Sequence, residues 1–331
     1  VSETLAFGPE DSGTEEFSIT YAAAAGATVV LDGGRSITGW TKGPDEVWTA
    51  KLPDVQVGRW YPRQLFVDGA RAIRARMPNA GWCEGKPVRP IEHESTDQPV
   101  EIRIRTDGGT GIFGWAREFE CELMPIEGSI AAWGNMGDVE LVSLRHNEGG
   151  RKPLAAVDPE ARTVTLRPPH RWAPKCYGND WFNGVPDGRC YLENAAEFLD
   201  SPGEWYLDRT SGVLSYWPRA GEDPARWRVV APVVRDCLLR VAGTKDRPVT
   251  NLHFHGLQVE HVDWPLPAHG YAGLFCCNVP VFREGGDPGH RFIDAAVVAT
   301  SSPKVWILRP NEPPTSGATM RTLCSGMPRV R

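Results

Sequence analysis

The chain has 331 residues, of which 41% are hydrophobic and 24% are charged, so it can bury a packed core and is not disordered throughout. Its net charge of −6 argues against nucleic acid as the main partner, because binding phosphates requires a basic patch. No apolar run is long enough to cross a bilayer, which excludes a membrane-spanning helix.

The start of the chain, VSETLAFGPEDSG, lacks the charged and apolar regions of a signal peptide and has no starting Met. We therefore interpret the chain as a fragment or a processed form of a longer protein. The eight Cys residues form no CxxC pair and no zinc-type spacing, which favours scattered buried thiols. A bridge between Cys176 and Cys190 is the alternative.

Turn residues are abundant, with 35 Gly and 29 Pro, and the apolar runs between them have the length and alternation of strands. The first part of the chain predicts strands at 17–23, 27–34 and 36–40. The middle predicts a hairpin over 64–76 with Asp68-Gly69 as its turn, and further strands at 100–107, 138–144 and 162–169. The last part predicts strands at 228–234, 237–243, 249–262, 292–300 and 304–308.

Residues 251–262, NLHFHGLQVEHV, alternate between apolar and polar side chains and then bend at Gly256. This pattern is typical of one coil of a β-solenoid, in which apolar side chains of short strands point inward. We therefore predict an all-β chain that begins a solenoid at residues 1–43 and leaves it for an inserted β domain at 44–226. It returns to the solenoid at 227–308 and ends in an irregular tail at 309–331.

The stretch YLENAAEFLD (191–200) fits a short helix with Glu193 and Glu197 on one face. The residues that follow fit a hairpin with Gly212 at a position of positive φ. A glycosidase needs two carboxylates that flank the scissile bond from two sides, and two acids on one helical face do not meet that requirement. We therefore interpret Glu193 and Glu197 as structural ion-pair or capping residues.

Two motifs raise the question of a cofactor or a metal. GTGIFG (109–114) matches GxGxxG, but no βαβ pattern surrounds it, so we interpret it as a Gly-rich loop. His253 and His255 share one face of a predicted strand and could hold a metal, but the sequence places no third ligand beside them. We predict neither a cofactor nor a metal, and we interpret both His residues as solvent-facing.

The segment VEHVDWPLPAHGY (259–271) combines acids, imidazoles and aromatic rings at a strand end and in a loop, and these are the ingredients of carbohydrate chemistry. Three acids are the candidate catalytic residues: Glu260, Asp263 and Asp294. Four residues are candidates for binding the substrate: His261, Trp264, His269 and Tyr271. The alternative is an ordinary solvated corner with a Trp over the core.

Four stretches carry a family resemblance, in this order: GGRSITGW, RQLFVDGARAIRARMPN, YLENAAEFLDSPGEWYLDRTSGVLSYWPRAGED and LHFHGLQVEHVDW. Together they resemble the right-handed parallel β-helix proteins related to glycoside hydrolase family 141, over most of residues 5–300. The resemblance implies a pectin-lyase-like, right-handed parallel β-helix with an inserted antiparallel β domain. It also implies a secreted or periplasmic protein that acts on plant or algal polysaccharides, with fucosidase and xylanase activities known in the family.

Members of that family use a pair of acidic residues on the β-helix face, in coils that we place beyond residue 308. The tail of this chain does not resemble those coils, so we expect part of the active site to be missing. The leading interpretation is a glycoside hydrolase with acid/base carboxylate catalysis and a polysaccharide or oligosaccharide as its partner. The alternatives are a non-catalytic carbohydrate-binding or surface β-helix protein, and a polysaccharide lyase, which often needs Ca²⁺ on a carboxylate cluster.

Overall fold

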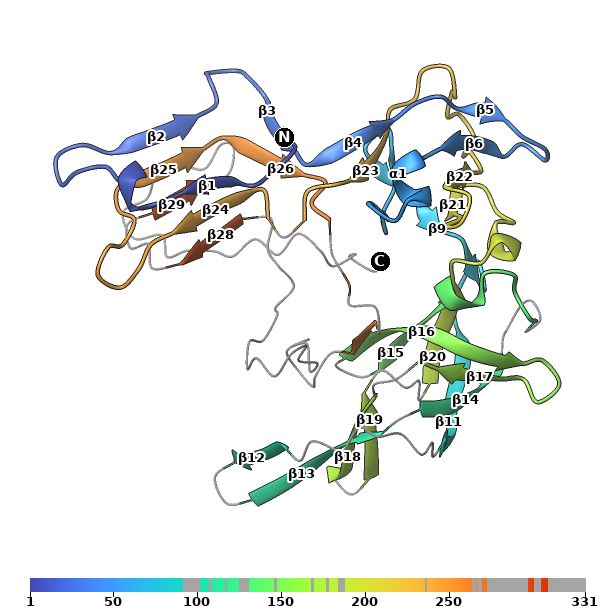
Figure 1. Ribbon diagram of the computed structural model, residues 1–331. Coiled ribbons are helices and arrows are strands. Elements are labelled where there is room, and N and C mark those ends of the chain that lie inside the picture. Colours follow the sequence, from blue (N-terminus) through green and yellow to red (C-terminus); the bar gives the residue numbers. More distant parts are fainter. Residues whose placement is uncertain are drawn as a thin grey trace.

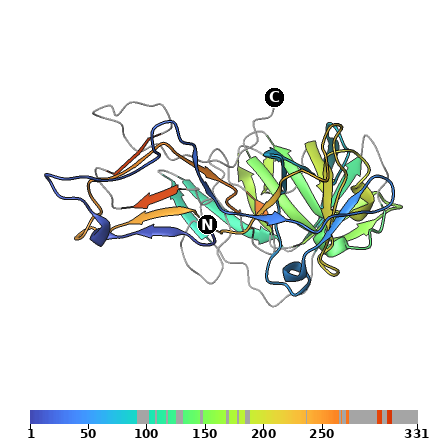
Figure 2. The same ribbon diagram turned by 90° about the horizontal axis from the view of Figure 1, so that it is seen from above.

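The computed structural model describes the chain in segments and shows an elongated molecule built of β-sheets (Figures 1 and 2). No described helix is long and apolar enough to span a membrane. The prediction of an all-β chain is confirmed, since the described helices are single turns: α1 (Pro53–Gln56), η1 (Pro9–Asp11), η2 (Met136–Asp138) and η3 (Ala196–Phe198). The described residues are 1–91, 102–106, 109–116, 118–124, 131–145, 148–167, 170–176, 179–183, 188–235, 237–263, 266, 270–272, 297–300 and 305–308.

Three small parallel sheets lie at one end of the molecule, on the left of Figure 1. Each pairs a strand from the first 32 residues with a strand that lies more than 200 residues further along the chain. The first sheet is β1 (Leu5–Phe7), β24 (Leu239–Ala242) and β28 (Val297–Thr300), the second is β2 (Ile19–Ala22), β25 (Leu252–His255) and β29 (Val305–Leu308), and the third is β3 (Val29–Asp32) and β26 (Leu257–Glu260).

The core of these parallel sheets follows from the alternation in the sequence. In β25, Leu252 and Phe254 are buried, whereas His253 and His255 between them are half-buried. The strand bends at Gly256, whose φ of 71° is a left-handed conformation that favours glycine. The strand and bend predicted from NLHFHGLQVEHV are therefore confirmed.

Two antiparallel sheets continue from the parallel sheets, in the upper right of Figure 1. One consists of β4 (Gly34–Ile37), β23 (Val229–Pro232), β7 (Phe66–Val67) and β8 (Ala70–Arg71). The other consists of β5 (Thr41–Lys42), β6 (Trp48–Lys51), β22 (Val213–Tyr216), β21 (Glu204–Leu207) and β9 (Ile73–Arg74), with β9 and β21 parallel. One buried core, which includes Trp205, Leu214 and Tyr216, joins them.

The largest sheet lies in the lower right of Figure 1 and carries a second buried core. Its order is β10 (Arg76–Met77), β20 (Gly188–Glu193), β11 (Cys83–Ile91), β14 (Glu118–Met124), β17 (Thr163–Leu166), β16 (Glu148–Asp158) and β15 (Glu140–Arg145). β15 also pairs with β20, and β27 (Tyr271–Ala272) pairs with β16. A separate sheet contains β12 (Ile102–Thr106), β13 (Gly109–Ala116), β18 (His170–Cys176) and β19 (Asn179–Asn183).

Most of the described strand pairs are antiparallel, so these pairings do not by themselves establish the right-handed parallel β-helix, which stays a prediction. Two predicted hairpins are confirmed. Asp68 and Gly69, with φ of 50° and 79°, turn β7 into β8, and Gly212, with φ of 68°, ends the turn between β21 and β22. A Cβ atom on Gly212 would lie 2.6 Å from the carbonyl oxygen of Leu52, so this turn requires glycine.

Two local predictions are wrong. The helix predicted at 191–200 is absent, because β20 continues to Glu193 with partners on both sides and only the short turn η3 follows. Two flanking strands satisfy the backbone groups that a helix would otherwise pair. The GTGIFG motif is not a loop, because it lies inside β13, which pairs with β12 and with β18.

The structure also tests the predicted arrangement of the cysteine side chains. Cys190 of β20 lies directly opposite Cys83 of β11, with 3.4 Å between the two Sγ atoms, and both side chains are buried. Cys190 therefore faces Cys83 instead of the alternative partner, Cys176. The irregular tail predicted at 309–331 lies outside the described residues.

Glu204, at the start of β21, is a carboxyl group with unusual surroundings. Only 2% of the residue is exposed, and its two oxygens accept long hydrogen bonds of 3.3 Å from the backbone N–H groups of Arg76 and Asp200. Burial, together with the nearby charge of Asp200, raises the pKa of Glu204 to about 7.

We expect Glu204 to make the protein less stable as the pH rises. A raised pKa means that the folded state holds the proton more tightly, so this contribution is complete below about pH 4.5 and is lost as the pH passes about 7. Glu204→Gln should remove the loss, which amounts to about 3 kcal/mol at most. Urea unfolding at about pH 5 and about pH 8 measures it. The exposed acid variant Glu160→Gln should keep the wild-type dependence, and a Glu204→Gln variant that also keeps it would contradict the assignment.

Candidate functional site

The predicted acid-rich segment begins at the corner where β26 ends. Glu260 is the last residue of β26 and lies opposite Asp32 of the parallel strand β3. His261 follows with a φ of 56°, so the chain turns sharply there. The Nδ1 atom of His261 lies 2.7 Å from Oδ1 of Asp32, and its ring packs edge-on against Phe66 with 4.6 Å between centroids. The corner therefore contains a partly buried imidazole–carboxylate pair.

Asp32 is held in its ionised form. Burial alone would raise its pKa, but hydrogen bonds from the Gly34 N–H and from His261, together with the charge of Arg228, keep the pKa of Asp32 below its usual value. An acid that stays ionised at neutral pH orients the imidazole but does not donate a proton to a leaving group. Asp32 therefore positions His261.

The corner brings three predicted residues together in the order Glu260, His261 and Asp263. Glu260 is half-buried, while Asp263 is buried with its carboxylate 4.0 Å from Nε of Arg235. The Asp263 N–H donates to the Val234 carbonyl at 2.8 Å, which fixes the strand end.

The remaining predicted residues lie elsewhere. Trp264, His269 and Asp294 fall outside the described residues. The backbone of Tyr271 belongs to β27, where it pairs with Arg151 of β16. Among the parts of the chain that the structure describes, no group of three His, Cys, Asp or Glu side chains is arranged to hold a metal ion.

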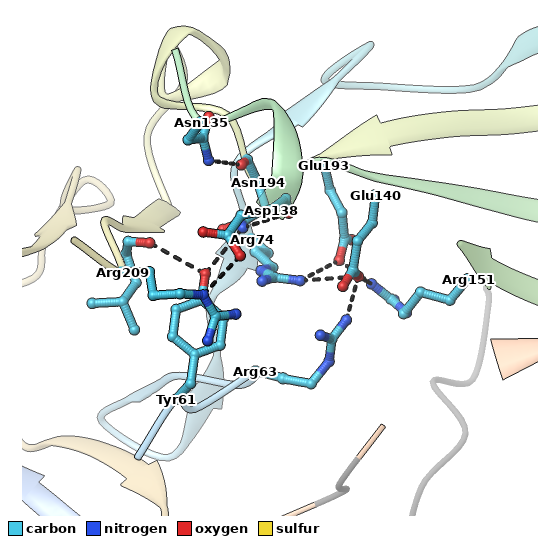
Figure 3. Close-up of polar contacts among 11 residues, drawn as sticks. Tyr61, Arg63, Arg74, Asn135, Asp138, Glu140, Arg151, Glu193, Asn194 and Arg209 are labelled. Atoms are coloured by element: carbon cyan, nitrogen blue, oxygen red, sulfur yellow. Dashed lines mark hydrogen bonds and ion pairs between the residues drawn. The ribbon is translucent and has the colours of Figure 1, made fainter. Parts of the chain in front are cut away.

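A second cluster of charges lies in the largest sheet, where Glu140 of β15 and Glu193 of β20 face each other (Figure 3). Three guanidinium groups approach the two carboxylates from different sides: Arg63, Arg74 and Arg151. Nη1 of Arg74 lies 3.2 Å from Glu140 and 3.0 Å from Glu193, and thus joins both acids. Arg151 also contacts both, and Arg63 contacts Glu140.

This ionic cluster is structural. Burial alone would raise the pKa of Glu140, but the charges of Arg63, Arg74 and Arg151 hold it well below its usual value. Glu140 therefore stays ionised at neutral pH and does not act as a general acid. The ion pairs of Glu193 agree with the structural role that the sequence indicated, although its strand conformation does not.

An open groove of ≈ 600 Å³ lies beside this cluster. Three turns form it: the segment around η2, the segment around η3 and the turn between β21 and β22. Its polar lining offers carboxylate, amide and hydroxyl groups, from Asn135, Asp138, Glu197, Tyr206, Asp208 and Thr210. Gly134, Met136, Gly137 and Ala196 complete the lining.

Neither the role of Asp32 nor the groove could be predicted from the sequence. Asp32 precedes two glycines at a strand end, which indicates a turn but not a His261 partner more than 200 residues away. The groove residues come from three polar turns, and a sequence does not show which turns meet in space. Tyr206 fits an ordinary alternating strand and carries no separate signal.

Known proteins resemble this chain in sequence and in fold. The sequence model of the family described as "GH141 insertion domain" matches residues 45–219, which is more than half of the chain. No curated protein matches the chain. A solved structure titled "Glycoside hydrolase" has a similar fold, with a TM-score of 0.63 and 22% sequence identity. The likeness covers 94% of this chain and 52% of that one, so the chain spans about half the length of that protein.

We expect Glu140→Gln to destabilise the protein strongly. The change removes one of two buried carboxylates and leaves the guanidinium groups of Arg63, Arg74 and Arg151 without full compensation. Breaking a buried ion pair from one side costs roughly 3–5 kcal/mol. Urea unfolding at neutral pH measures the change.

The matched control for this prediction is Asp223→Asn. Asp223 forms an ion pair with Arg226 at 3.5 Å in which both side chains are well exposed. Such pairs contribute little, so the control should change the free energy of unfolding by less than about 1 kcal/mol. If both variants lost the same small amount, the ionic cluster would not be a structural requirement.

Proposed function

The chain belongs to the GH141 insertion domain family, and on that premise we propose that it is part of a glycoside hydrolase acting on a plant or algal polysaccharide. The observation that carries the proposal is the family match over residues 45–219. The fold similarity to a solved glycoside hydrolase, which extends over 94% of the chain, supports it. We further propose that the protein is secreted or periplasmic, where such polymers are found.

The three parallel sheets support a right-handed parallel β-helix in this proposal. Chain segments before and after the inserted domain supply neighbouring strands in the same order, since β1, β2 and β3 pair with β24, β25 and β26. A solenoid stacks successive coils in this way. In the proposed arrangement residues 1–43 and 227–308 belong to the coils, and residues 44–226 form the insertion.

The proposed chemistry uses the corner at the end of β26. One carboxylic acid protonates the leaving oxygen while a second acts as base or nucleophile, and the candidates are Glu260, Asp263 and Asp294. Asp32 and His261 fix the corner through their 2.7 Å contact. Trp264, His269 and Tyr271 are the candidates that shape the sugar site beside it.

A second candidate function is carbohydrate binding without catalysis. The groove of ≈ 600 Å³ favours it, because its carboxylate, amide and hydroxyl groups lie in the inserted domain, apart from the corner at β26. Groups of these kinds form the hydrogen bonds that orient a small ligand in a pocket of this size.

Assays of turnover on plant and algal polysaccharides distinguish catalysis from binding without catalysis. A hydrolase releases reducing ends without new ultraviolet absorbance, whereas a lyase forms an unsaturated product that absorbs. We expect reducing ends alone. Binding without any product would favour the second candidate, and an absorbing product would identify a lyase.

The acids of the corner are tested by Glu260→Gln and Asp263→Asn, each of which removes a charge and keeps the size of the side chain. We expect each variant to lower kcat about 100-fold or more, the usual contribution of a positioned acid or base. Asp246→Asn changes an exposed turn and should keep full activity. Full activity in both corner variants would reject the assignment.

A further inference from the structure

We propose that the groove between η2, η3 and the β21–β22 turn is a binding site for a neutral saccharide unit. The inference rests on the proposed function only in taking carbohydrate as the class of ligand. It concerns a different place in the molecule from Glu260 and Asp263, because every residue that lines the groove belongs to the inserted segment.

The hydroxyl group of Tyr206 is a hydrogen-bond donor at the groove. The residue is only 8% exposed, its ring packs in the core of the largest sheet, and it lines the groove. The hydroxyl forms no hydrogen bond with any residue in the described part of the chain. The hydroxyl oxygen is not one of the described buried polar atoms that lack a partner, so it reaches the solvent of the groove, where it can donate a hydrogen bond to a ligand.

Tyr216, in the other strand of the same hairpin, shows the usual arrangement. It is also buried, but its hydroxyl donates to Glu222 at 2.6 Å. The two tyrosines therefore differ in one respect that matters here, which is whether the chain itself satisfies the hydroxyl group.

Acceptor groups line the groove together with Tyr206. Burial and the charges of Asp208, Asp138 and Glu197 raise its pKa, so the hydroxyl keeps its proton and acts as a donor. Asp138 uses one oxygen for Arg209 at 2.8 Å, which leaves the other oxygen available. The carboxylate of Glu197 is exposed and forms no ion pair or hydrogen bond within the described residues.

The wall of the groove is already fixed in place, as Figure 3 shows for its inner residues. Asn135 donates from Nδ2 to the Asn194 carbonyl at 2.7 Å, and Asn194 donates to the Asp138 carbonyl at 2.8 Å. Arg209, which pairs with Asp138, stacks on Tyr61 at 3.6 Å from the ring centroid. Groups held in this way lose little conformational entropy when a ligand binds.

The lining also indicates the chemical class of the ligand. It contains three carboxylates and no Lys or Arg side chain, so a uronate, sulfate or phosphate would meet like charge. A neutral sugar offers hydroxyl groups that donate to Asp138 and Glu197 and accept from Tyr206. The volume of ≈ 600 Å³ lies within the range of small-molecule sites.

The test compares two hydroxyl deletions in the full chain by isothermal titration calorimetry. The probes are neutral xylo-, cello- and galacto-oligosaccharides, with tetragalacturonate and CaCl₂ as further arms. Tyr206→Phe should weaken binding of the neutral probe by about tenfold or more, because a donor to the ligand is lost. It should leave the Tm unchanged or raise it, because no internal hydrogen bond is broken.

Tyr216→Phe is the matched control. It should lower the Tm, since the bond to Glu222 is lost, and it should bind the neutral probe with the wild-type affinity. Glu197→Gln, which alters an exposed acceptor of the groove, should weaken binding without changing the Tm.

Three results would overturn the inference: no saturable binding by any neutral probe, binding that Tyr206→Phe leaves intact, or preferential binding of tetragalacturonate or Ca²⁺. The outcome is independent of catalysis. Binding that depends on Tyr206 would support the groove whether or not this chain turns over a substrate. Turnover without such binding would support the hydrolase and reject the groove.

Discussion

The facing carboxylates of Glu140 and Glu193 are the constraint on which much of the inserted domain depends. Like charges directly opposite each other on neighbouring strands repel, and burial makes the repulsion stronger. Arg74 lies in β9, a strand of a different sheet, and its guanidinium group forms ion pairs with both acids. The contact that offsets the repulsion therefore also joins the two sheets. Asp138 precedes Glu140 by two residues and Asn194 follows Glu193 directly, so the ionic cluster also sets the position of the groove wall.

The corner at the end of β26 is also held together by an ionised acid. Asp32 is kept ionised by donors from three directions, Gly34, His261 and Arg228, and in return it fixes the turn at His261. Both places use ionised acids to hold structure. A proton donor therefore has to be sought among other acids, and we propose Glu260, a half-buried residue that lies opposite Asp32 in the β3–β26 pair.

Strands and hairpins could be predicted because their signals are local. Alternation in NLHFHGLQVEHV and the glycines at 69 and 212 act over a few residues, and the structure follows them. The helix at 191–200 failed because pairing across β20 outweighed a local propensity. The role of Glu193 could be inferred in kind, but not its partners Arg74 and Arg151. The groove could not be predicted at all, because three separate turns form it.

The parallel pairing of β1 with β24 has a consequence for how the chain folds. Leu5 meets Leu239 in this ladder, and the whole inserted domain lies between them in the sequence. Closing so long a loop carries a large entropy cost unless the intervening segment has already become compact. The antiparallel pairing of β6 with β22 brings the two ends of that segment together and shortens the effective loop. Loop-closure entropy therefore predicts that the insertion forms first and the parallel ladders form last.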